Sequence, residues 1–427
     1  MKNIVIIGAG FGGLRVALSL ARNLKRHKLQ NKYRIFLIDK NSYQIYTPTL
    51  YEAATTSKET ANYLDLQEIM TFPIKDLVAN LPISFVHDKV QELDLLNGDI
   101  HCQNQKLKFD YLVLAMGSEP NFYDITGLEK YALTFKTFLD AIKLRDRLLE
   151  IYFEKSANHE DFKIVIGGGG PTSVELAGEI QGWLCALKQE FKKECLTPVT
   201  IVQGGPTILP GLDDRIIKRA SARLKQLKVD VLTSEKIIGV QEKKILLASQ
   251  KEIFYDLLIW TGGVKASALM SALPLKKAGS KVLAVGAMEC LPQTPDLKLY
   301  GDIYGLGDAV CFYDSKTNLP VPMTAHAAII QGGIVASNIF ENIKFREKIV
   351  SSKQSFIYEP SNYPYVTPIG GKYAIAKIGP FVFAGLFGWI FKGLVELYYL
   401  LSIRPFFCAI RLWLKGLRIF IQNDRLG

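Results

Sequence analysis

Cysteine and histidine are scarce in this chain of 427 residues, which narrows the chemistry open to it. It has six cysteines and five histidines, and no two cysteines form a Cys-x-x-Cys pattern. Structural zinc sites and dithiol redox motifs need closely spaced cysteine or histidine ligands, so we expect neither, and no other metal site. The same scarcity argues against a disulfide framework and for reduced thiols, as in an intracellular protein.

Long uncharged apolar runs are also missing. The longest one near the C-terminus covers residues 378–391, whereas a membrane-spanning helix needs about 20 apolar residues, so we expect no spanning segment. A signal peptide is not expected either, because glycines break the first apolar strand at once. What is present is an apolar fraction of 48% and a net charge of +11. These values predict two or three folded domains and favour phosphate-rich ligands or an anionic membrane surface.

A glycine-rich turn follows the first expected strand. The strand Ile4–Ile7 runs into Gly8-Ala9-Gly10-Phe11-Gly12-Gly13, which opens a helix, and the next strand, Tyr33–Ile38, ends at Asp39. In such a turn the first spaced glycine permits a tight bend, the second admits a pyrophosphate and the third allows close helix packing. The helix N-terminus attracts phosphate charge, and the Asp39 carboxylate can accept hydrogen bonds from ribose hydroxyls. The pattern predicts a site for an adenine dinucleotide.

A second copy of this pattern begins at the strand Lys163–Ile166 and continues through Gly167-Gly168-Gly169-Gly170-Pro171-Thr172. It departs from the first copy twice: Ser173 stands at the third glycine position, and Gln203 stands where an acid would bind the ribose. A neutral amide does not repel a 2′-phosphate as a carboxylate does, so we expect this site to accept both NADH and NADPH. No Lys or Arg follows Gln203 directly, but Gly204-Gly205 leaves room for a cation from elsewhere in the chain.

The second pattern starts before the first has enough strands to close a sheet, so we interpret it as an insertion. The expected fold class is α/β, with two Rossmann-like dinucleotide-binding domains, the second inserted in the first, and an amphipathic C-terminal region. Two nested dinucleotide sites indicate hydride transfer from a nicotinamide to a bound flavin. Gly307 and Asp308 follow a late strand and are expected to contact that flavin, although an aspartate after glycine can also cap a helix. The expected domains are a flavin domain over 1–118 and 288–345, an NAD(P)H domain over 119–287, and a membrane-association region over 346–427.

The C-terminal region combines aromatic and basic residues at helical spacing. Arg404, Arg411, Lys415 and Arg418 fall on one face of a helix expected over Leu401–Gln422. The opposite face is apolar and aromatic, which is typical of a helix that lies in the membrane interface. A helix that packs on the core or forms a dimer contact is the alternative.

These features together resemble the type II NADH:quinone oxidoreductases, which are single-subunit flavoproteins of the membrane surface. The resemblance implies FAD in the first domain, NAD(P)H in the inserted one and a membrane quinone as electron acceptor, without proton pumping. It also implies a peripheral protein on the cytoplasmic face of the cell membrane, with a homodimer as one option. Because the basic residues lie in an aromatic amphipathic tail, no nucleic-acid partner is expected. Besides that tail, the matching pieces, in family order, are Gly8–Gly13, Tyr43–Ala54, Leu112–Gly117, Gly168–Glu179, Trp260–Ser267, Tyr304–Ala309 and Pro322–Gly332.

The resemblance assigns catalytic roles to three residues. Glu175 matches an acid placed near the contact of nicotinamide and flavin, although a carboxylate in the first turn of a helix also has a purely structural explanation. His326 and Gln331 lie in the quinone-side segment, where His326 can donate to a quinone oxygen, relay a proton, or only pack near the flavin. The family usually has glutamines where this chain has His326 and Ile330.

Cofactor and quinone contacts follow from the same resemblance. The quinone is expected to contact Tyr46, Leu50, Ala325 and Ile330. The flavin is expected to contact Gly8, Gly10, Phe11, Gly12, Gly13, Asp39, Lys40, Val90, Ala115, Gly117, Gly307 and Asp308. The nicotinamide nucleotide is expected to contact Gly168, Gly170, Pro171, Thr172, Gln203 and Gly263.

Two other functions remain open. A soluble flavoprotein reductase of a carrier such as rubredoxin or ferredoxin would share the two nucleotide turns but would not need an apolar tail. A slow-turnover, redox-sensing flavoprotein would not need a quinone. Disulfide reductases and sulfide:quinone reductases require cysteines close to the flavin, but residues 40–60 contain none and Cys311 has no obvious partner.

Overall fold

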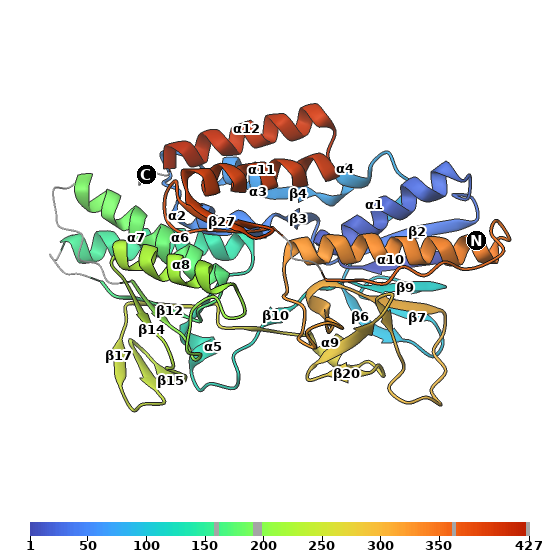
Figure 1. Cartoon of the computed structure of the whole chain (residues 1–427), viewed down its shortest axis with the longest axis horizontal. Helices are drawn as coiled ribbons and strands as arrows, with labels where there is room; N and C mark the ends of the chain where they lie inside the picture. Colours follow the sequence, from blue (N-terminus) through green and yellow to red (C-terminus); the bar gives the residue numbers. More distant parts are fainter. Residues whose placement is uncertain (158–161, 191–198, 361–363, 424–427) are drawn as a thin grey trace. The chain divides into compact units, whose positions relative to one another are not determined.

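The computed structural model describes residues 1–157, 162–190, 199–360 and 364–423 (Figure 1). The chain divides into two compact units, each assembled from separate segments. Unit 1 comprises Met1–Gln44, Phe72–Glu119 and Val264–Asn362, and unit 2 comprises Ile45–Thr71, Pro120–Gly263 and Tyr363–Gly427.

Unit 1 contains an open sheet whose central strands are parallel. β1 (Lys2–Ile7) pairs with β2 (Tyr33–Asp39) on one side and with β9 (Tyr111–Leu114) on the other. β2 continues to β5 (Ile83–His87) and β9 to β23 (Asp302–Gly305), again in parallel. Beyond β23 the sheet continues antiparallel through β22 (Glu289–Cys290) and β21 (Lys281–Val285) to β20 (Lys277–Ala278). β9 and the end of β1 are apolar and buried, as expected for parallel strands covered on both faces.

Two long helices of unit 1 pack against each other, α1 (Phe11–Arg26) and α10 (Ala325–Arg346). Glycines permit this approach. A Cβ at Gly12 would stand 2.9 Å from the main-chain oxygen of Ala328, and a Cβ at Gly332 would stand 2.6 Å from the main-chain oxygen of Gly12. The start of α1, where the first glycine turn lies, is therefore held directly against the backbone of α10.

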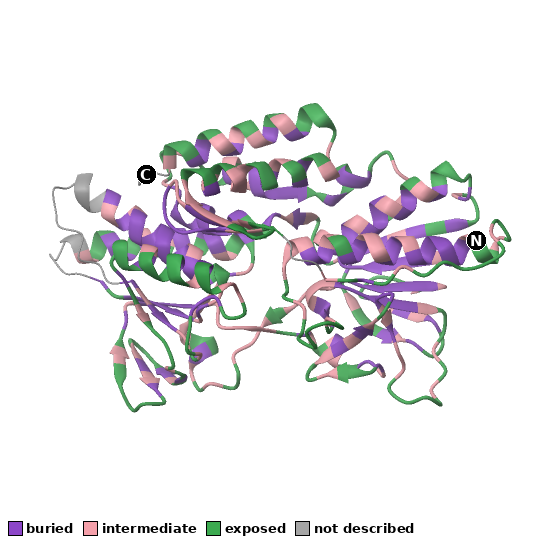
Figure 2. Cartoon of the chain, viewed as in Figure 1, coloured by how far each residue is buried: buried purple, intermediate pink, exposed green. Residues whose placement is uncertain are grey.

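Unit 2 contains a second parallel sheet, in the order β11-β18-β12-β13-β14. The crossovers from β12 to β13 and from β13 to β14 contain α7 (Pro171–Glu190) and α8 (Asp214–Gln226). β12 and β18 are buried along their whole length (Figure 2). The sheet strands are β11 (Leu133–Thr134), β18 (Leu257–Trp260), β12 (Ile164–Gly167), β13 (Val199–Val202) and β14 (Val229–Leu232). The predicted α/β fold class, with two sheets of the kind found in dinucleotide-binding domains, is thus confirmed.

Two small antiparallel sheets complete unit 2. One consists of β15 (Ile237–Gln241), β16 (Lys244–Leu247) and β17 (Glu252–Phe254), and the other of β25 (Tyr365–Pro368), β26 (Ala374–Ile378) and β27 (Phe381–Gly385).

The remaining elements are distributed over both units. The long helix α6 spans Phe138–Ala157. The shorter elements are β3 (Tyr43–Ile45), η1 (Thr47–Thr49), α2 (Leu50–Thr55), α3 (Tyr63–Met70), β4 (Thr71–Pro73), α4 (Ile74–Val78), β6 (Val90–Asp94), β7 (Asp99–Cys102), β8 (Lys106–Lys108), β10 (Glu119–Pro120), α5 (Leu128–Tyr131), β19 (Val264–Lys265), α9 (Ala268–Ala272), β20 (Lys277–Ala278), β21 (Lys281–Val285), β22 (Glu289–Cys290), η2 (Gly307–Ala309) and β24 (Val310–Cys311).

The C-terminal residues form two helices rather than the single helix expected over Leu401–Gln422. α11 (Leu386–Ile403) and α12 (Phe406–Asn423) pack on each other, and α11 also packs on β25, β26 and β27. By length and composition alone, α11 is apolar enough to cross a membrane, which differs from the expectation of no spanning segment. Its two charged residues, Lys392 and Glu396, are largely buried within unit 2.

Candidate functional site

The first glycine turn combines two crowded positions with one open position. Gly8 has a φ of +103°, and a Cβ there would stand 2.2 Å from the main-chain oxygen of Ala115. A Cβ at Gly13 would stand 1.9 Å from the main-chain oxygen of Gly8, so both positions require glycine. Beside Gly10 no protein atom lies within 4 Å of the Cβ position. The turn therefore leaves space at the N-terminus of α1, where unpaired N–H groups favour an anion.

Asp39 is held at the carboxyl end of β2, next to this turn. Its Oδ2 accepts a hydrogen bond from Ala9 N at 2.7 Å, and its Oδ1 accepts one from Asn41 N at 2.8 Å. Two backbone donors thus orient the carboxylate. The main-chain oxygen of the neighbouring Lys40 contacts His87 Nε2 at 3.1 Å.

Gly307 and Asp308, which follow β23 in unit 1, are hydrogen-bonded to α10 and to the loop after β9. Gly307 N donates to Gln331 Oε1 at 2.7 Å, and Ser118 Oγ donates to Asp308 Oδ2 at 3.0 Å. Asp308 lies within η2 and does not cap it, so the capping alternative does not apply. Gly117, which precedes Ser118, has a φ of +69° and open space around its Cβ position. Open turns and fixed carboxylates of this kind fit an adenine dinucleotide such as FAD.

The remaining residues expected at the flavin are placed as follows. Phe11 is the first residue of α1 and is half-buried, and Val90 is the first residue of β6. Ala115 lies directly after β9 and is buried against the first glycine turn. All belong to unit 1.

The second glycine turn has the same geometry in unit 2. Gly168 has a φ of +109°, and a Cβ there would stand 2.6 Å from Gly262 Cα. No protein atom lies within 4 Å of the Cβ position of Gly170, and α7 begins at the next residue, Pro171, followed by Thr172, both exposed. This arrangement fits a second dinucleotide.

The two departures of the second turn have structural explanations. Ser173 is fully buried, and its Oγ lies 2.6 Å from the Oγ1 of Thr261, so its hydroxyl is satisfied against the loop after β18. Gln203 Nε2 donates to the main-chain oxygen of Thr207 at 3.2 Å, and its side chain lies against Gly169. Gln203 therefore braces its own loop. Gly263 has a φ of +152°, and its main-chain oxygen accepts a hydrogen bond from Asn121 N at 3.0 Å.

Four ionisable residues of unit 2 form a group that we call the buried charge cluster: Glu52, Glu175, Lys392 and Glu396. Lys392 on α11 forms an ion pair with Glu52 on α2, whose side chain is only 2% exposed. The Lys392 ammonium also lies over the rings of Tyr51 and Phe420, at 5.4 and 5.1 Å. One lysine ammonium lies near three carboxyl groups, so ionising all three at once would cost free energy.

The pKa values in this cluster reflect that imbalance. Burial raises the pKa of Glu175 to about 8; the Lys392 charge opposes this shift and the Glu52 charge adds to it. Burial also raises the pKa of Glu396 to about 7, again opposed by Lys392. Glu175 is therefore mainly protonated at neutral pH, a state suited to donating a proton.

The residues expected at the quinone belong to both units. In unit 1, Ala325, His326 and Ile330 occupy the first turns of α10, and burial lowers the pKa of His326, which favours its neutral form. In unit 2, Tyr46 and Leu50 flank η1 and are buried. The Tyr46 ring stacks on Tyr399 of α11 at 5.1 Å between centroids.

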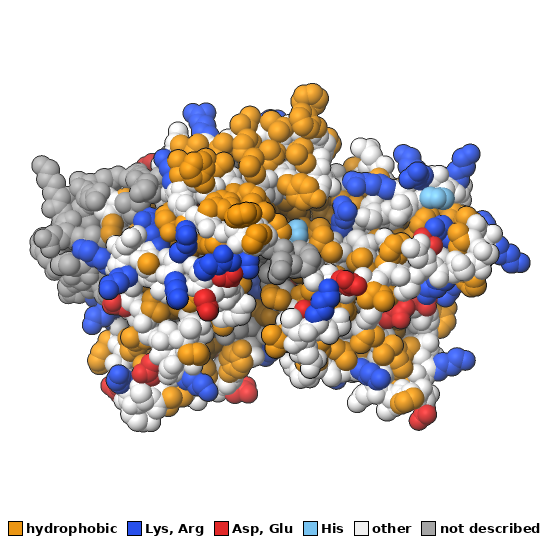
Figure 3. All heavy atoms as spheres, in the orientation of Figure 1, with side chains coloured by type: hydrophobic (Ala, Val, Ile, Leu, Met, Phe, Trp, Pro, Cys, Tyr) orange, Lys and Arg blue, Asp and Glu red, His pale blue; other side chains and the backbone are white. Residues whose placement is uncertain are grey.

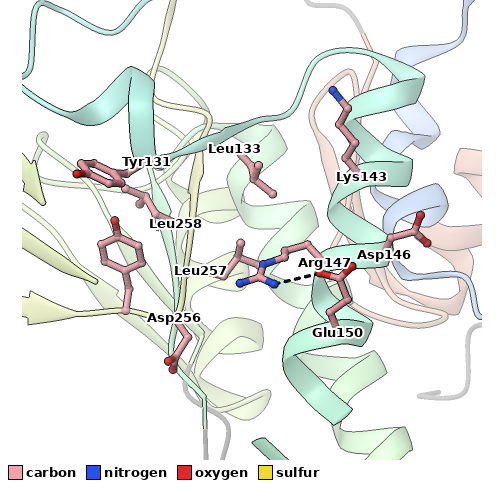
Figure 4. A pocket seen from close by; sticks show the side chains of 10 residues that line it. Tyr131, Leu133, Lys143, Asp146, Arg147, Glu150, Asp256, Leu257 and Leu258 are labelled. Carbon is pink, nitrogen blue, oxygen red and sulfur yellow. Dashed lines mark hydrogen bonds and ion pairs between the residues drawn. The ribbon is translucent and has the colours of Figure 1, made fainter. Parts of the chain in front are cut away.

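One cavity of 490 Å³ lies away from these features (Figure 4). Its lining includes Tyr255, Asp256 and Leu257, at the amino end of β18, and Arg147, whose guanidinium pairs with Glu150 at 3.0 Å. The second glycine turn follows the carboxyl end of β12, which is parallel to β18. The cavity is therefore at the opposite edge of the sheet from the nucleotide turn.

Metal and thiol chemistry are limited in the described part of the chain. No group of three or more metal-ligating side chains occurs among the described residues. Among the described cysteines, Cys102, Cys290, Cys311 and Cys408 are free.

Two parallel sheets, each with a glycine turn that leaves space at a helix N-terminus, form an arrangement that is typical of proteins with two nucleotide sites. The family model described as pyridine nucleotide-disulphide oxidoreductase matches residues 2–332. The chain belongs to this family and is an oxidoreductase.

Individual proteins that are similar to this chain indicate which kind of enzyme within the family it resembles. A type II NADH:quinone oxidoreductase of Staphylococcus saprophyticus is 26% identical over 79% of this chain and 82% of that protein. The structure of NDH2 from Plasmodium falciparum in complex with NADH has a TM-score of 0.81 at 18% identity and covers 99% of both chains. The sulfide:quinone oxidoreductase of Aquifex aeolicus has a TM-score of 0.73 at 19% identity, over 95% and 92% of the chains. The resemblance to type II NADH:quinone oxidoreductases is thus confirmed.

Sequence analysis missed three members of the buried charge cluster. Glu52 lies within a matching segment but was not expected to act, and Lys392 and Glu396 were not among the expected site residues. A signal for them exists: a lysine and a glutamate four residues apart in an otherwise apolar helix need buried partners.

Proposed function

We propose that this chain is an FAD-dependent NAD(P)H:quinone oxidoreductase that works at a membrane surface. The observation that carries the proposal is the open space beside Gly10 and beside Gly170, each at the N-terminus of a helix in its own unit. Two such turns support one retained dinucleotide and one that exchanges. No proton pumping is part of the proposal.

Unit 1 supplies the groups that would hold FAD. The N-terminus of α1 would bind the pyrophosphate, and the Asp39 carboxylate would accept the adenosine ribose hydroxyls. Asp308, oriented by Ser118, would bind the ribityl end. When held by these residues, FAD would supply the chemistry of hydride acceptance from the nicotinamide and of two-electron transfer to the quinone.

Unit 2 supplies the groups that would hold the nicotinamide nucleotide. The N-terminus of α7 would bind its pyrophosphate beside Gly170, and the segment at Gly263 would approach its nicotinamide end. Because Gln203 places an amide where a carboxylate would repel a 2′-phosphate, both NADH and NADPH are expected substrates.

Glu175 is the proposed proton donor, since reduction of a quinone consumes two protons. Burial raises the pKa of its carboxyl group to about 8, against the charge of Lys392 and with that of Glu52, so the group is mainly protonated at neutral pH. Lys392 would stabilise the carboxylate that remains after the proton has left, which keeps the transfer reversible. Glu175 lies beyond the first turn of α7, which begins at Pro171, so the helix-start explanation does not account for it.

The quinone contacts proposed in unit 1 lie on α10, and those proposed in unit 2 lie around η1. His326, mainly neutral, can donate to a quinone oxygen or pass on a proton. Gln331 would act indirectly, because its side-chain oxygen already accepts a hydrogen bond from Gly307. The other residues proposed to contact the quinone are Ala325 and Ile330 in unit 1, and Tyr46 and Leu50 in unit 2.

Membrane attachment is proposed through the outward faces of α11 and α12. Phe387, Leu394, Tyr398, Phe406 and Phe407 are all exposed, and apolar side chains cover this region of the molecular surface (Figure 3). An exposed apolar area of this kind is typical of a surface that contacts lipid or a partner. The proposed location is the cytoplasmic face of the cell membrane.

The basic side chains of α12 contribute less to this surface than the sequence predicts. Lys415 pairs with Asp65 at 2.8 Å and with Glu68 at 2.7 Å, both on α3. Arg411 lies 3.7 Å from Glu68 but is largely exposed. Lipid contact would therefore depend mainly on the apolar residues.

Steady-state turnover tests the function. The full-length protein, purified with its flavin, should oxidise NADH and NADPH with a short-chain ubiquinone or menaquinone analogue as sole acceptor. A protein that reduces ferredoxin or rubredoxin but no quinone would be a soluble reductase instead. A protein that is reduced once by the nucleotide and does not turn over with any acceptor would be a redox sensor.

A further inference from the structure

The loop after Gln203 is bonded to the loop that follows the next strand of the sheet. Gln203 N donates to the main-chain oxygen of Leu232 at 2.8 Å, and Glu235 N donates to that of Gln203 at 3.1 Å. Ser234 N donates to the main-chain oxygen of Gly205 at 2.8 Å. Both loops follow the carboxyl ends of parallel strands, β13 and β14, the edge at which a dinucleotide binds.

Lys236 extends from the second loop over the first. A Cβ at Gly204 would stand 3.3 Å from Lys236 Cγ, so the lysine stem passes beside the residue that directly follows Gln203. Any side chain at position 204 would compete with the lysine stem for this space. The stem of a lysine therefore lies beside the residue after Gln203, although no Lys or Arg follows Gln203 directly in the sequence.

The backbone of Lys236 is fixed, whereas its side chain is exposed. Its main-chain oxygen accepts a hydrogen bond from Ala248 N at 2.8 Å. The next residue, Ile237, is buried, and its Cδ1 would lie 3.3 Å from a Cβ at Gly167, directly under the second glycine turn. The position of Lys236 is thus coupled to the turn that would hold the nucleotide.

The charges around Lys236 leave it available for an anion. The neighbouring carboxylate, Glu235, lies 3.9 Å from the ammonium of Lys251. Within the described residues, no ion pair engages Lys236. Because the charge of Lys251 offsets that of Glu235, the net charge of these two residues together with Lys236 is positive.

We propose that Lys236 binds the 2′-phosphate of NADPH and so determines how well this chain uses NADPH. The proposal rests on the proposed function, because it names the residue that recognises one of the two nucleotides. NADH carries a hydroxyl at this position and gains nothing comparable from an ammonium, since hydrogen bonds between two charged groups are the stronger ones. Gln203 permits the 2′-phosphate, and Lys236 attracts it.

The first test measures binding without turnover. Adenosine 2′,5′-bisphosphate and adenosine 5′-monophosphate are titrated calorimetrically into the full-length, flavin-loaded protein. Lys236→Gln should weaken binding of the bisphosphate about tenfold and leave the monophosphate within about twofold, because one charged hydrogen bond is lost. Lys236→Arg should retain most of the affinity. Lys228→Gln is the matched control, because Lys228 precedes the amino end of β14, at the opposite edge of the sheet.

The second test measures kcat/KM for both nucleotides with a short-chain quinone. Lys236→Gln should lower the value for NADPH about tenfold and leave that for NADH within about twofold. Unchanged bisphosphate affinity, or an equal loss for both ligands, would overturn the proposal. If the wild type oxidised neither nucleotide, the proposed function would fail, while the titration would still decide the role of Lys236.

Discussion

Single residues in the two glycine turns are constrained by different partners. At Gly8 and Gly13 the protein itself excludes a side chain, because backbone oxygens occupy the Cβ positions. At Gly10 and Gly170 the protein leaves the Cβ position open, so only a ligand can exclude a side chain there. Substitutions at these two kinds of glycine therefore separate folding from cofactor binding.

Gly10→Val should give a folded protein without flavin. The backbone of Gly10 has an ordinary φ of −70° and no protein atom near its Cβ position, so valine fits the fold and occupies the space proposed for the pyrophosphate. The measurement is the flavin absorbance per protein, with circular dichroism to confirm folding. Gly170→Val is the matched control, since it should keep the flavin and lose the nicotinamide nucleotide. A Gly10→Val protein with full flavin would contradict the proposed site.

Glu175→Gln should change the pH dependence of turnover as well as its rate. The pKa of Glu175 is raised to about 8, so the carboxyl group is protonated below that pH and loses its proton as the pH rises through it. If the protonated form donates the proton, wild-type kcat should fall above about pH 8. The glutamine variant should lack this bend and turn over on the order of a hundredfold more slowly, the lower end of general acid catalysis.

The pH profile of kcat for wild type and Glu175→Gln decides this role. A purely structural Glu175 would lower activity at all pH values without moving the bend. Glu179→Gln, one turn further along α7, is the control for changing a buried carboxyl group on the same helix.

At the scale of elements, the C-terminal hairpin of α11 and α12 is part of unit 2. α11 delivers Lys392 to Glu52, and α12 contributes the Phe420 ring beneath the same ammonium. The indole of Trp413 on α12 donates to the main-chain oxygen of Gly393 at 2.7 Å. Deleting residues 380–427 would remove β27 as well as both helices, so substitutions test this region more cleanly than truncation does.

Lys392→Met should destabilise unit 2 more than loss of one surface charge does. It would leave the Glu52 carboxylate buried without its cation, which costs about 3–5 kcal/mol in the free energy of unfolding. The double variant Lys392→Met with Glu52→Gln should recover much of that loss, because no uncompensated charge remains. Urea unfolding of the single and double variants measures the difference. Additive losses would show that the two side chains do not form an energetic pair.

At the scale of the whole molecule, α11 and α12 present exposed apolar faces, which the proposed membrane contact would cover. Phe387 is 76% exposed and Phe407 is 84% exposed. Each ring would therefore bury a large apolar area if it entered lipid. The ion pairs of Lys415 with α3 leave fewer basic side chains to attract anionic lipid. Binding to vesicles should therefore depend on apolar contact more than on salt.

The double variant Phe387→Ser with Phe407→Ser should bind vesicles at least about tenfold more weakly, since a buried phenylalanine contributes about 1.5–3 kcal/mol. Turnover with a short-chain quinone should persist while turnover with a long-chain quinone in vesicles falls. Phe254→Ser, which removes a 58% exposed phenylalanine from β17, is the matched control. Co-sedimentation with anionic and neutral vesicles gives the measurement, and wild-type binding by the double variant would make the hairpin a protein contact instead.

What the sequence alone determined is the part of the fold that depends on local pattern. The two glycine turns, the strands before and after them and the α/β class follow from spacings within about 40 residues, because turn geometry and helix or strand periodicity are short-range properties. The resemblance to the family followed from the same short motifs in their order.

Only the tertiary structure decided which distant charges meet. Lys392 and Glu52 are 340 positions apart, and no local pattern predicts that α11 would bring one onto the other. Gln203 and Lys236 lie in the loops that follow two neighbouring strands, β13 and β14, and their proximity depends on how these loops are hydrogen-bonded at the edge of the sheet. Local sequence sets the conformation of each segment, whereas the burial of a charge or the placement of a cation depends on all the segments that pack around it.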